Sequence, residues 1–244
     1  MVTTISKEAC LGRASVSCLG MSKKSPVVSP AISLEALAAE SGLAAASRQR
    51  ILDAAVAEFA EQGFAGARVD AIALRAGINK RMLYAYVGNK KALWLAALER
   101  VYEAKRQEER TLNLQRLAPT EAMQLLIRFN FRYHTEHPEF LAMLNDENLQ
   151  RGQNLRESQR VSQLYSPLLS LISDVLARGQ TEGVFRRNID PMQLYISMVG
   201  LGYFFCSNQH TLSAIFGRTL SSVEEVLTRE QHIVDVIMGF LRPE

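Results

Sequence analysis

The sequence predicts an all-α protein, and three observations support this class. Residues that favour helices (Leu, Ala, Glu, Gln and Arg) are abundant, whereas strand signals are sparse. Apolar residues recur at three- and four-residue spacing along most of the chain. Gly, Pro, Ser, Asp and Asn interrupt these stretches where helices begin and end. With 244 residues, of which 48% are hydrophobic and 22% charged, the chain has the composition of a globular protein with a substantial core.

Composition argues against a membrane-spanning or secreted protein. The longest apolar run, Leu194–Cys206, contains two glycines and is too short to cross a bilayer. The first residues lack the continuous apolar block of a secretory signal. Three cysteines, Cys10, Cys18 and Cys206, are an odd number without metal-ligand spacing. We therefore expect a cytoplasmic protein that holds no metal and no other cofactor.

The N-terminal part is predicted to contain an arm followed by a helix. Residues 1–46 are rich in Ser and Ala, so we expect a flexible arm in which a frayed helix begins near Leu34. The first regular helix is predicted over Arg48–Gln62. Ser47 is the expected N-cap, and Gly63 is expected to end the helix.

Three short helical pieces follow within Val69–Trp94. The first ends at Gly77, a residue suited to the left-handed conformation at a helix C-terminus. Asn79 is the expected N-cap of the second piece, which directs Leu83 and Val87 inward. Two short helices joined by a glycine-containing turn form the sequence pattern of a helix-turn-helix. We call the second of them, residues 79–87, the reading helix.

Positive charge is concentrated in the same stretch. Six cations and one anion lie between Phe64 and Trp94, although the net charge of the whole chain is only +3. The six are Arg68, Arg75, Lys80, Arg81, Lys90 and Lys91. Such a surface suits the phosphates of double-stranded DNA, and a merely solvated surface is the alternative.

A set of motif residues runs in order through the segment Ser47–Ala97: Gly63-Phe64, Ile72-Ala73, Ala76-Gly77-Ile78, Leu83-Tyr84, Val87, Lys90 and Leu93. In these residues the segment resembles the DNA-binding domain of the TetR family of transcriptional regulators. Ala67 and Arg68 depart from the Thr or Ser that the family usually has at the start of the second helix. Arg81 and Met82 replace a common Gly-Thr pair, which affects the expected target sequence and not the fold.

The reading helix is expected to place its N-terminal side chains in the major groove. Arg81 is expected to donate two hydrogen bonds to a guanine. The resemblance implies that Tyr84 and Lys90 contact phosphates. The expected DNA-binding residues are Arg68, Asn79, Lys80, Arg81, Tyr84, Tyr86, Lys90 and Lys91.

A connecting helix is predicted from Lys90 to about Leu112, and its mixed-charge segment KRQEER, residues 105–110, is expected to be solvated. Further helices are predicted over residues 119–136, 138–152, 157–181, 192–207 and from 221 or 222 onward. This second half resembles the C-terminal domain of the TetR branch that contains the pyrimidine-utilisation repressor. The expected domains are therefore residues 47–97, which bind DNA, and residues 98–244, a helical bundle for ligand binding and dimerisation.

The run Leu194–Cys206 is apolar on all sides, so every face of that helix must be covered. A core helix alone would account for this pattern, but a helix that also packs on a second subunit accounts for it better. The resemblance implies a homodimer formed through the last two major helices. The expected interface residues are Tyr195, Val199, Tyr203, Val234, Ile237 and Leu241.

The second domain carries many aromatic residues and methionines, which suit a small planar ligand held by a few polar groups. We expect Asn145 and Asn148 to be buried. The expected pocket residues are Phe129, Tyr133, Met143, Asn148 and Tyr165. The resulting hypothesis is a ligand-responsive repressor that binds a palindromic operator as a dimer and is released by an unknown small molecule.

Two other functions remain open at this point. The first is an architectural or activating DNA-binding protein without a ligand, which would have a fully packed interior. The second is an α-helical metal-dependent enzyme that uses His134, His137 and Glu147. We favour neither a metal nor an enzyme, because the His134-x-x-His137 spacing straddles an expected helix end and no nucleophile–base spacing is present.

Overall fold

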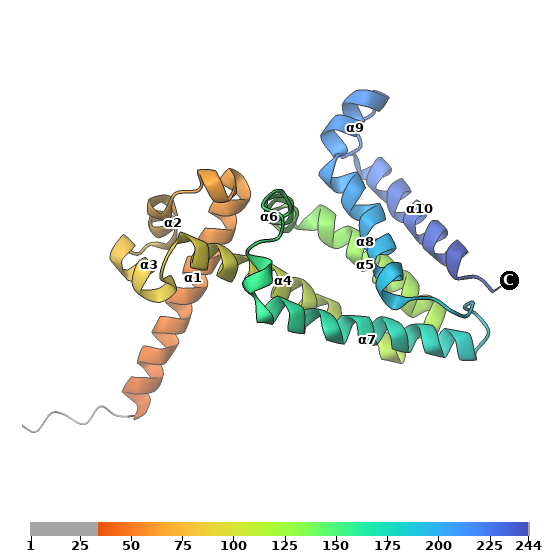
Figure 1. Ribbon diagram of the computed structural model, residues 1–244, viewed down its shortest axis with the longest axis horizontal. Coiled ribbons are helices and arrows are strands. Elements are labelled where there is room, and N and C mark those ends of the chain that lie inside the picture. The colour runs from red at the N-terminus through yellow and green to blue at the C-terminus, as the bar shows by residue number, and fades with distance from the viewer. Residues whose placement is uncertain (1–33, 244) are drawn as a thin grey trace, which may run out of the picture. The chain divides into compact units, whose positions relative to one another are not determined.

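The computed structural model describes residues 34–243, with the side chains of residues 44–161, 163 and 167–243. Ser41–Glu244 form one compact unit, and of the other unit only the helical residues 34–40 are described. Residues 41–46 of the expected flexible arm are also helical, and its residues 1–33 lie outside the described part of the chain. Helices and turns, without a strand, make up the described part of the chain, so the prediction of an all-α fold is confirmed (Figure 1). None of these helices combines the length and apolarity needed to cross a membrane.

We call residues 47–97 the head. Its helices are α1 (Leu34–Gly66), α2 (Val69–Ala76), α3 (Lys80–Val87) and the start of α4 (Lys90–Thr111). The prediction of Ser47 as an N-cap is wrong, because α1 begins at Leu34 and Ser47 lies inside it. Gly63 does interrupt α1, as predicted, since its φ of 67° is not helical.

We call residues 98–244 the body. Beyond α4 its helices are α5 (Pro119–Glu136), α6 (Pro138–Leu149), α7 (Gln159–Thr181), α8 (Pro191–Ser207), α9 (Gln209–Phe216) and α10 (Val223–Leu241). Side chains cap α8 and α10 at their N-termini: Asp190 accepts from the Met192 backbone N–H at 2.8 Å, and Ser222 accepts from the Glu225 backbone N–H at 3.4 Å. Helix α9 was not predicted. Helices α8 and α10 pack against each other (Figure 1).

Head and body share one apolar core. Trp94, which is fully buried, contacts the Phe59 ring edge-to-face with 4.9 Å between ring centroids. The same cluster of buried residues continues through Tyr133 and Met143 of the body. A second cluster, formed by α5, α7, α8 and α10, fills the rest of the body. The head is therefore supported by packing and not only by its covalent connection through α4.

The prediction that the segment KRQEER on α4 is solvated is wrong for half of its residues. Gln107, Glu108 and Arg110 are exposed as expected, and the other three are not. Lys105, Arg106 and Glu109 are 1%, 2% and 3% exposed. Tertiary packing explains this burial, because α5, α6 and α7 all pack against α4 and cover the face that carries these three residues.

Candidate nucleic-acid interface

The turn between α2 and α3 has the geometry that the sequence predicts. Gly77 adopts a left-handed conformation with φ 67° and ψ 34°. The backbone N–H of Ile78 donates to the Ala73 carbonyl at 3.0 Å. The Asn79 side chain accepts from the Met82 backbone N–H at 2.8 Å, so its role as N-cap is confirmed. The Oδ1 atom of Asn79 is therefore occupied, and only its amide nitrogen remains for a DNA contact.

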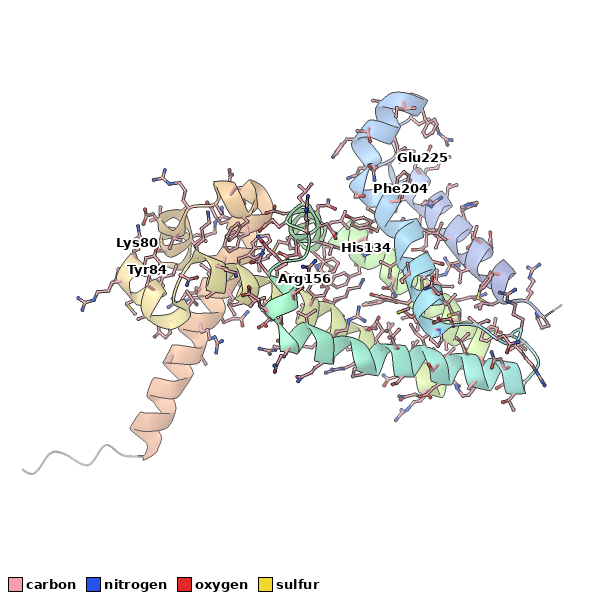
Figure 2. All side chains as sticks on the ribbon, viewed as in Figure 1. Lys80, Tyr84, His134, Arg156, Phe204 and Glu225 are labelled. Atoms are coloured by element: carbon pink, nitrogen blue, oxygen red, sulfur yellow. The ribbon has the colours of Figure 1, made fainter. Side chains whose placement is uncertain are left out.

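Helix α3 presents most of its surface outward. Leu83 is its one buried residue, and Val87 is half-buried. The exposed residues are Lys80, Arg81, Met82, Tyr84, Ala85 and Tyr86. Figure 2 shows Lys80 and Tyr84 on this helix. Met82 had no predicted role, yet its 41% exposure beside Arg81 places an apolar side chain on the same outward face.

Two of the predicted cations form ion pairs within the head. Lys80 Nζ lies 2.8 Å from Asp70 Oδ1, and the guanidinium of Arg75 makes two contacts of 2.9 Å with Glu61. The hydrogen bond from Lys80 lowers the pKa of Asp70, and the same contact raises the pKa of Lys80. Both groups stay ionised, so Lys80 is able to exchange a carboxylate for a DNA phosphate.

The two lysines at the start of α4 also contact other groups of the protein. Lys90 Nζ donates to the Ala65 carbonyl at 3.2 Å and lies 5.2 Å from the centre of the Phe64 ring. Lys91 Nζ lies 2.6 Å from Glu157 Oε1, a residue of the body. The local charge excess is thus smaller in the fold than in the sequence, because carboxylates from other segments approach this surface.

Arg68 and Arg81 differ from these cations. Neither forms an ion pair among the residues whose side chains are described, and both are exposed. Arg68 is the residue before α2 and provides no side-chain cap, as its departure from the usual Thr or Ser predicts. Its backbone N–H donates instead to Glu58 at 3.2 Å. Arg81 is left as an exposed cation on α3 without a carboxylate partner.

Helix α6 of the body carries two adjacent carboxylates that bind the head. Glu147 is 1% exposed and accepts from Trp94 Nε1 at 2.9 Å. It also accepts from the backbone and side chain of Asn154 at 2.8 and 2.9 Å and from the Leu155 backbone at 3.0 Å. Burial alone raises the pKa of Glu147, but these hydrogen bonds outweigh it and hold the pKa below its ordinary value. Asp146 accepts from the Phe64 backbone N–H at the end of α1.

Half of the predicted dimer residues do not face outward. Val234, Ile237 and Leu241 are at most 3% exposed and belong to the core of their own chain, so the prediction that they form an interface is corrected. The others, Tyr195, Val199 and Tyr203, are half-buried. The exposed apolar residues of α8 and α10 are Met192, Ile196, Phe204, Val223, Leu227, Val236 and Phe240.

The predicted pocket residues do not gather around one described cavity. Tyr133 and Met143 are buried in the shared core, and Phe129 packs beside Tyr133 with 5.8 Å between ring centroids. The expectation that Asn148 is buried is wrong, because it is exposed and its side chain donates to the Leu144 carbonyl. The side chain of Tyr165 lies outside the described part of the chain.

The three residues considered for a metal-dependent enzyme face separate partners. His134 Nε2 lies 3.5 Å from Lys105 Nζ, and His137 Nδ1 lies 2.9 Å from a Glu139 oxygen. Glu147 accepts the hydrogen bonds described above. Among the described residues, no group of three His, Cys, Asp or Glu side chains is arranged to hold a metal ion.

Comparison with known proteins decides the family. Residues 51–97 match the family model described as "Bacterial regulatory proteins, tetR family", and residues 119–237 match "Tetracyclin repressor-like, C-terminal domain". The "HTH-type transcriptional repressor NicS" of Pseudomonas putida is 34% identical over 196 residues, which cover 80% of this chain and 92% of that relative. The chain belongs to the TetR family. The resemblance inferred from the sequence is thereby confirmed.

Other relatives of this TetR-family chain agree. The "HTH-type transcriptional regulator RutR" of Escherichia coli O157:H7, a pyrimidine-utilisation regulator, is 25% identical over 202 residues, 81% of this chain and 92% of RutR. The structure of FadR from Bacillus subtilis in complex with stearoyl-CoA has the same fold, with a TM-score of 0.63 and 16% identity over 80% of this chain and all of FadR. This TetR-family chain is a DNA-binding transcriptional regulator and not an enzyme.

Proposed function

We propose that this TetR-family regulator is a cytoplasmic homodimeric repressor that binds a palindromic operator and leaves it when a small molecule binds the body. The head, residues 47–97, contacts DNA, and residues 98–244 bind the effector and form the dimer. The observation that carries the proposal is the presence of two different exposed surfaces on one chain. One is the cationic outward face of α3, and the other is the exposed apolar face of α8 and α10.

The α3 face supports binding in the major groove. Arg81 has no carboxylate partner among the described residues and stands near the N-terminus of α3, where base contacts are made. Met82 beside it suits contact with a thymine methyl group. Lys80, Lys90 and Lys91 are the proposed phosphate contacts, together with Arg68, Tyr84, Tyr86 and the amide nitrogen of Asn79.

The apolar face of α8 and α10 supports the dimer. Met192, Ile196 and Phe204 recur at multiples of four residues on α8, with Gly200 between the last two, so they lie along one side of the helix. Phe204 and Gly200 border a groove of about 540 Å³ whose other wall on α10 includes Val236 and Phe240. A twofold axis would bring two copies of this face together and place two heads on one side of the duplex.

The alternative of a DNA-binding protein without an effector is less well supported. A fully packed body would favour it, whereas the body contains a cavity of about 430 Å³ beside the buried His134. A volume of this size suits a small molecule.

Operator affinity should fall steeply with salt, and this dependence tests the proposal. We expect a footprint on DNA upstream of the gene itself, with a linear fall of log affinity against log salt concentration. Lys90→Gln should reduce the slope by about one, because one phosphate contact is lost. Arg116→Gln, which removes an exposed cation of the body, should leave the slope unchanged. An affinity that does not respond to salt would contradict DNA binding by this surface.

Arg81→Ala should relax the preference for one base pair in each half-site. The expected loss is about 1–3 kcal/mol of discrimination, since a bidentate contact to guanine is removed. The measurement is fluorescence anisotropy with a set of operators substituted at single positions. Lys91→Ala serves as a control and should weaken binding to all of these operators alike. An unchanged preference profile in Arg81→Ala would remove Arg81 from base recognition.

A further inference from the structure

A group of charged residues is buried in the body, and one of its cations lies outside the ion pair that the other two residues form. Lys105, Arg106 and Glu109 lie on one face of α4 and are each at most 3% exposed. Arg106 pairs with Glu109, with 2.7 Å between Nη1 and Oε2. Among the described side chains, no carboxylate forms an ion pair with Lys105. Two cations and one carboxylate are therefore buried together, and Lys105 lies outside the ion pair.

Apart from Arg106 and Glu109 on its own helix, the groups that contact the Lys105 ammonium are aromatic rings and an imidazole. Its Nζ lies 5.4 Å from the centre of the Tyr133 ring and 5.2 Å from that of Phe140. The nearest polar partner is His134 Nε2 at 3.5 Å. Burial, followed by the charge of Lys105, lowers the pKa of His134 to about 3, so this imidazole is neutral. Burial also lowers the pKa of Lys105 to about 7. An unneutralised ammonium in such an environment is unfavourable, and a bound anion would remove the penalty.

The contact with Lys105 fixes the direction of the His134 ring. When Lys105 is protonated its ammonium only donates, so the Nε2 atom facing it accepts and the proton of the neutral ring resides on Nδ1. That Nδ1 is buried and has no hydrogen-bond partner in the described part of the chain. It lies beside α8 at Gly202, where an added Cβ atom would stand 3.5 Å from it. His134 therefore presents an unused N–H donor on the side opposite Lys105.

His134 also forms part of the wall of the cavity of about 430 Å³. The other lining residues come from α5, α6, α8, α9 and the start of α10, and none of those described is Asp or Glu. Asn145 of α6 lines the same cavity, and its Oδ1 accepts from the Tyr203 hydroxyl. The Nδ2 of Asn145 is thus left as a second donor. Figure 2 shows His134 within the helical body, close to α6.

We propose that this cavity binds a small organic carboxylate as the effector. The carboxylate accepts hydrogen bonds from His134 Nδ1 and Asn145 Nδ2, and Lys105 on the other side of the imidazole supplies the compensating charge. The inference rests on the proposed function, because it names the chemical class of the molecule that releases the DNA. Lys105 is a positioning residue in this arrangement: it holds the His134 tautomer and does not touch the ligand.

The test compares acids with amides of nearly the same shape. Benzoate and benzamide, phenylacetate and phenylacetamide, and hexanoate and hexanamide are titrated into the full-length protein without DNA, by calorimetry and thermal shift. We expect at least one acid to bind with tenfold or greater preference over its amide. Lys105→Met should reduce that preference to threefold or less, while its melting temperature without ligand equals or exceeds that of the wild type. Arg116→Met, which removes an exposed cation of the same domain, should keep the preference.

A second variant covers the case in which Lys105→Met does not fold. Asn145 is only half-buried, so Asn145→Ala is expected to fold and to weaken acid binding at least fivefold. The inference is overturned if no acid in the panel is preferred over its amide. It is also overturned if folded Lys105→Met keeps the preference, or if Asn145→Ala binds the acid as the wild type does. DNA binding by the same preparations is measured separately: its loss alone would contradict the proposed function, and the loss of acid binding alone would contradict only this inference.

Discussion

If the subunits associate as proposed, Phe204→Arg should weaken dimerisation by about a hundredfold or more, which corresponds to roughly 2.7 kcal/mol, and leave the protein monomeric. Phe204 lies on the exposed face of α8 and is 57% exposed in the single chain. A charge placed there would be buried without a partner when two copies associate, and twofold symmetry would introduce it twice. Arginine is chosen because Arg229 borders the same groove and would pair with a new carboxylate.

Sedimentation velocity over a range of protein concentrations measures this effect directly. Operator affinity should fall in parallel, since a monomer presents one head to a two-half-site operator. Leu149→Arg is the matched control, because Leu149 is an 83% exposed apolar residue of α6 outside the α8 and α10 face. Phe204→Arg remaining dimeric at the wild-type concentration would show that the subunits associate elsewhere.

Glu147→Ala should lower the free energy of unfolding by about 3–5 kcal/mol. The Glu147 carboxylate accepts from Trp94, from both nitrogens of Asn154 and from Leu155, so its removal leaves four N–H donors without their acceptor. Urea denaturation at neutral pH measures the change. Glu157→Ala, which removes an exposed carboxylate paired with Lys91, should change stability by less than about 1 kcal/mol.

The same carboxylate should also contribute to the pH dependence of stability. The pKa of Glu147 is held below its ordinary value in the folded protein. Its contribution is therefore fully present above the ordinary pKa of a glutamate and is lost as the pH falls through the lowered value. The difference in stability between the wild type and Glu147→Ala should shrink in acid. If this difference in stability stayed constant down to the acid transition, folding would not lower the pKa of Glu147.

The head was largely predictable from the sequence because its geometry is fixed by local signals. Gly77 takes the left-handed conformation that ends α2, and Asn79 caps α3 through its own side chain. These features depend on residues within a few positions of one another. The carboxylates that pair with Arg75 and Lys91 were not predictable in this way, since Glu61 and Glu157 lie outside the cationic stretch from Phe64 to Trp94.

The body was less predictable because burial there depends on which helices cover which faces. The KRQEER segment has the mixed charge of a solvated surface, yet three other helices enclose Lys105, Arg106 and Glu109. On α10, apolar residues occupy more than one side of the helix. Spacing alone does not show that Ile237 faces the core whereas Val236 and Phe240 face outward.

The non-helical backbone at Gly63 determines which substitutions are accepted where the head contacts the body. A Cβ atom at position 63 would lie 3.3 Å from Asp146 Oδ2, and the positive φ itself disfavours any other residue. The carboxylate of Asp146 binds the main chain of Phe64 and not a side chain. Apart from proline, any residue at position 64 retains that N–H donor. Substitutions on α3 can therefore change the operator preference without removing this hydrogen bond between the head and α6.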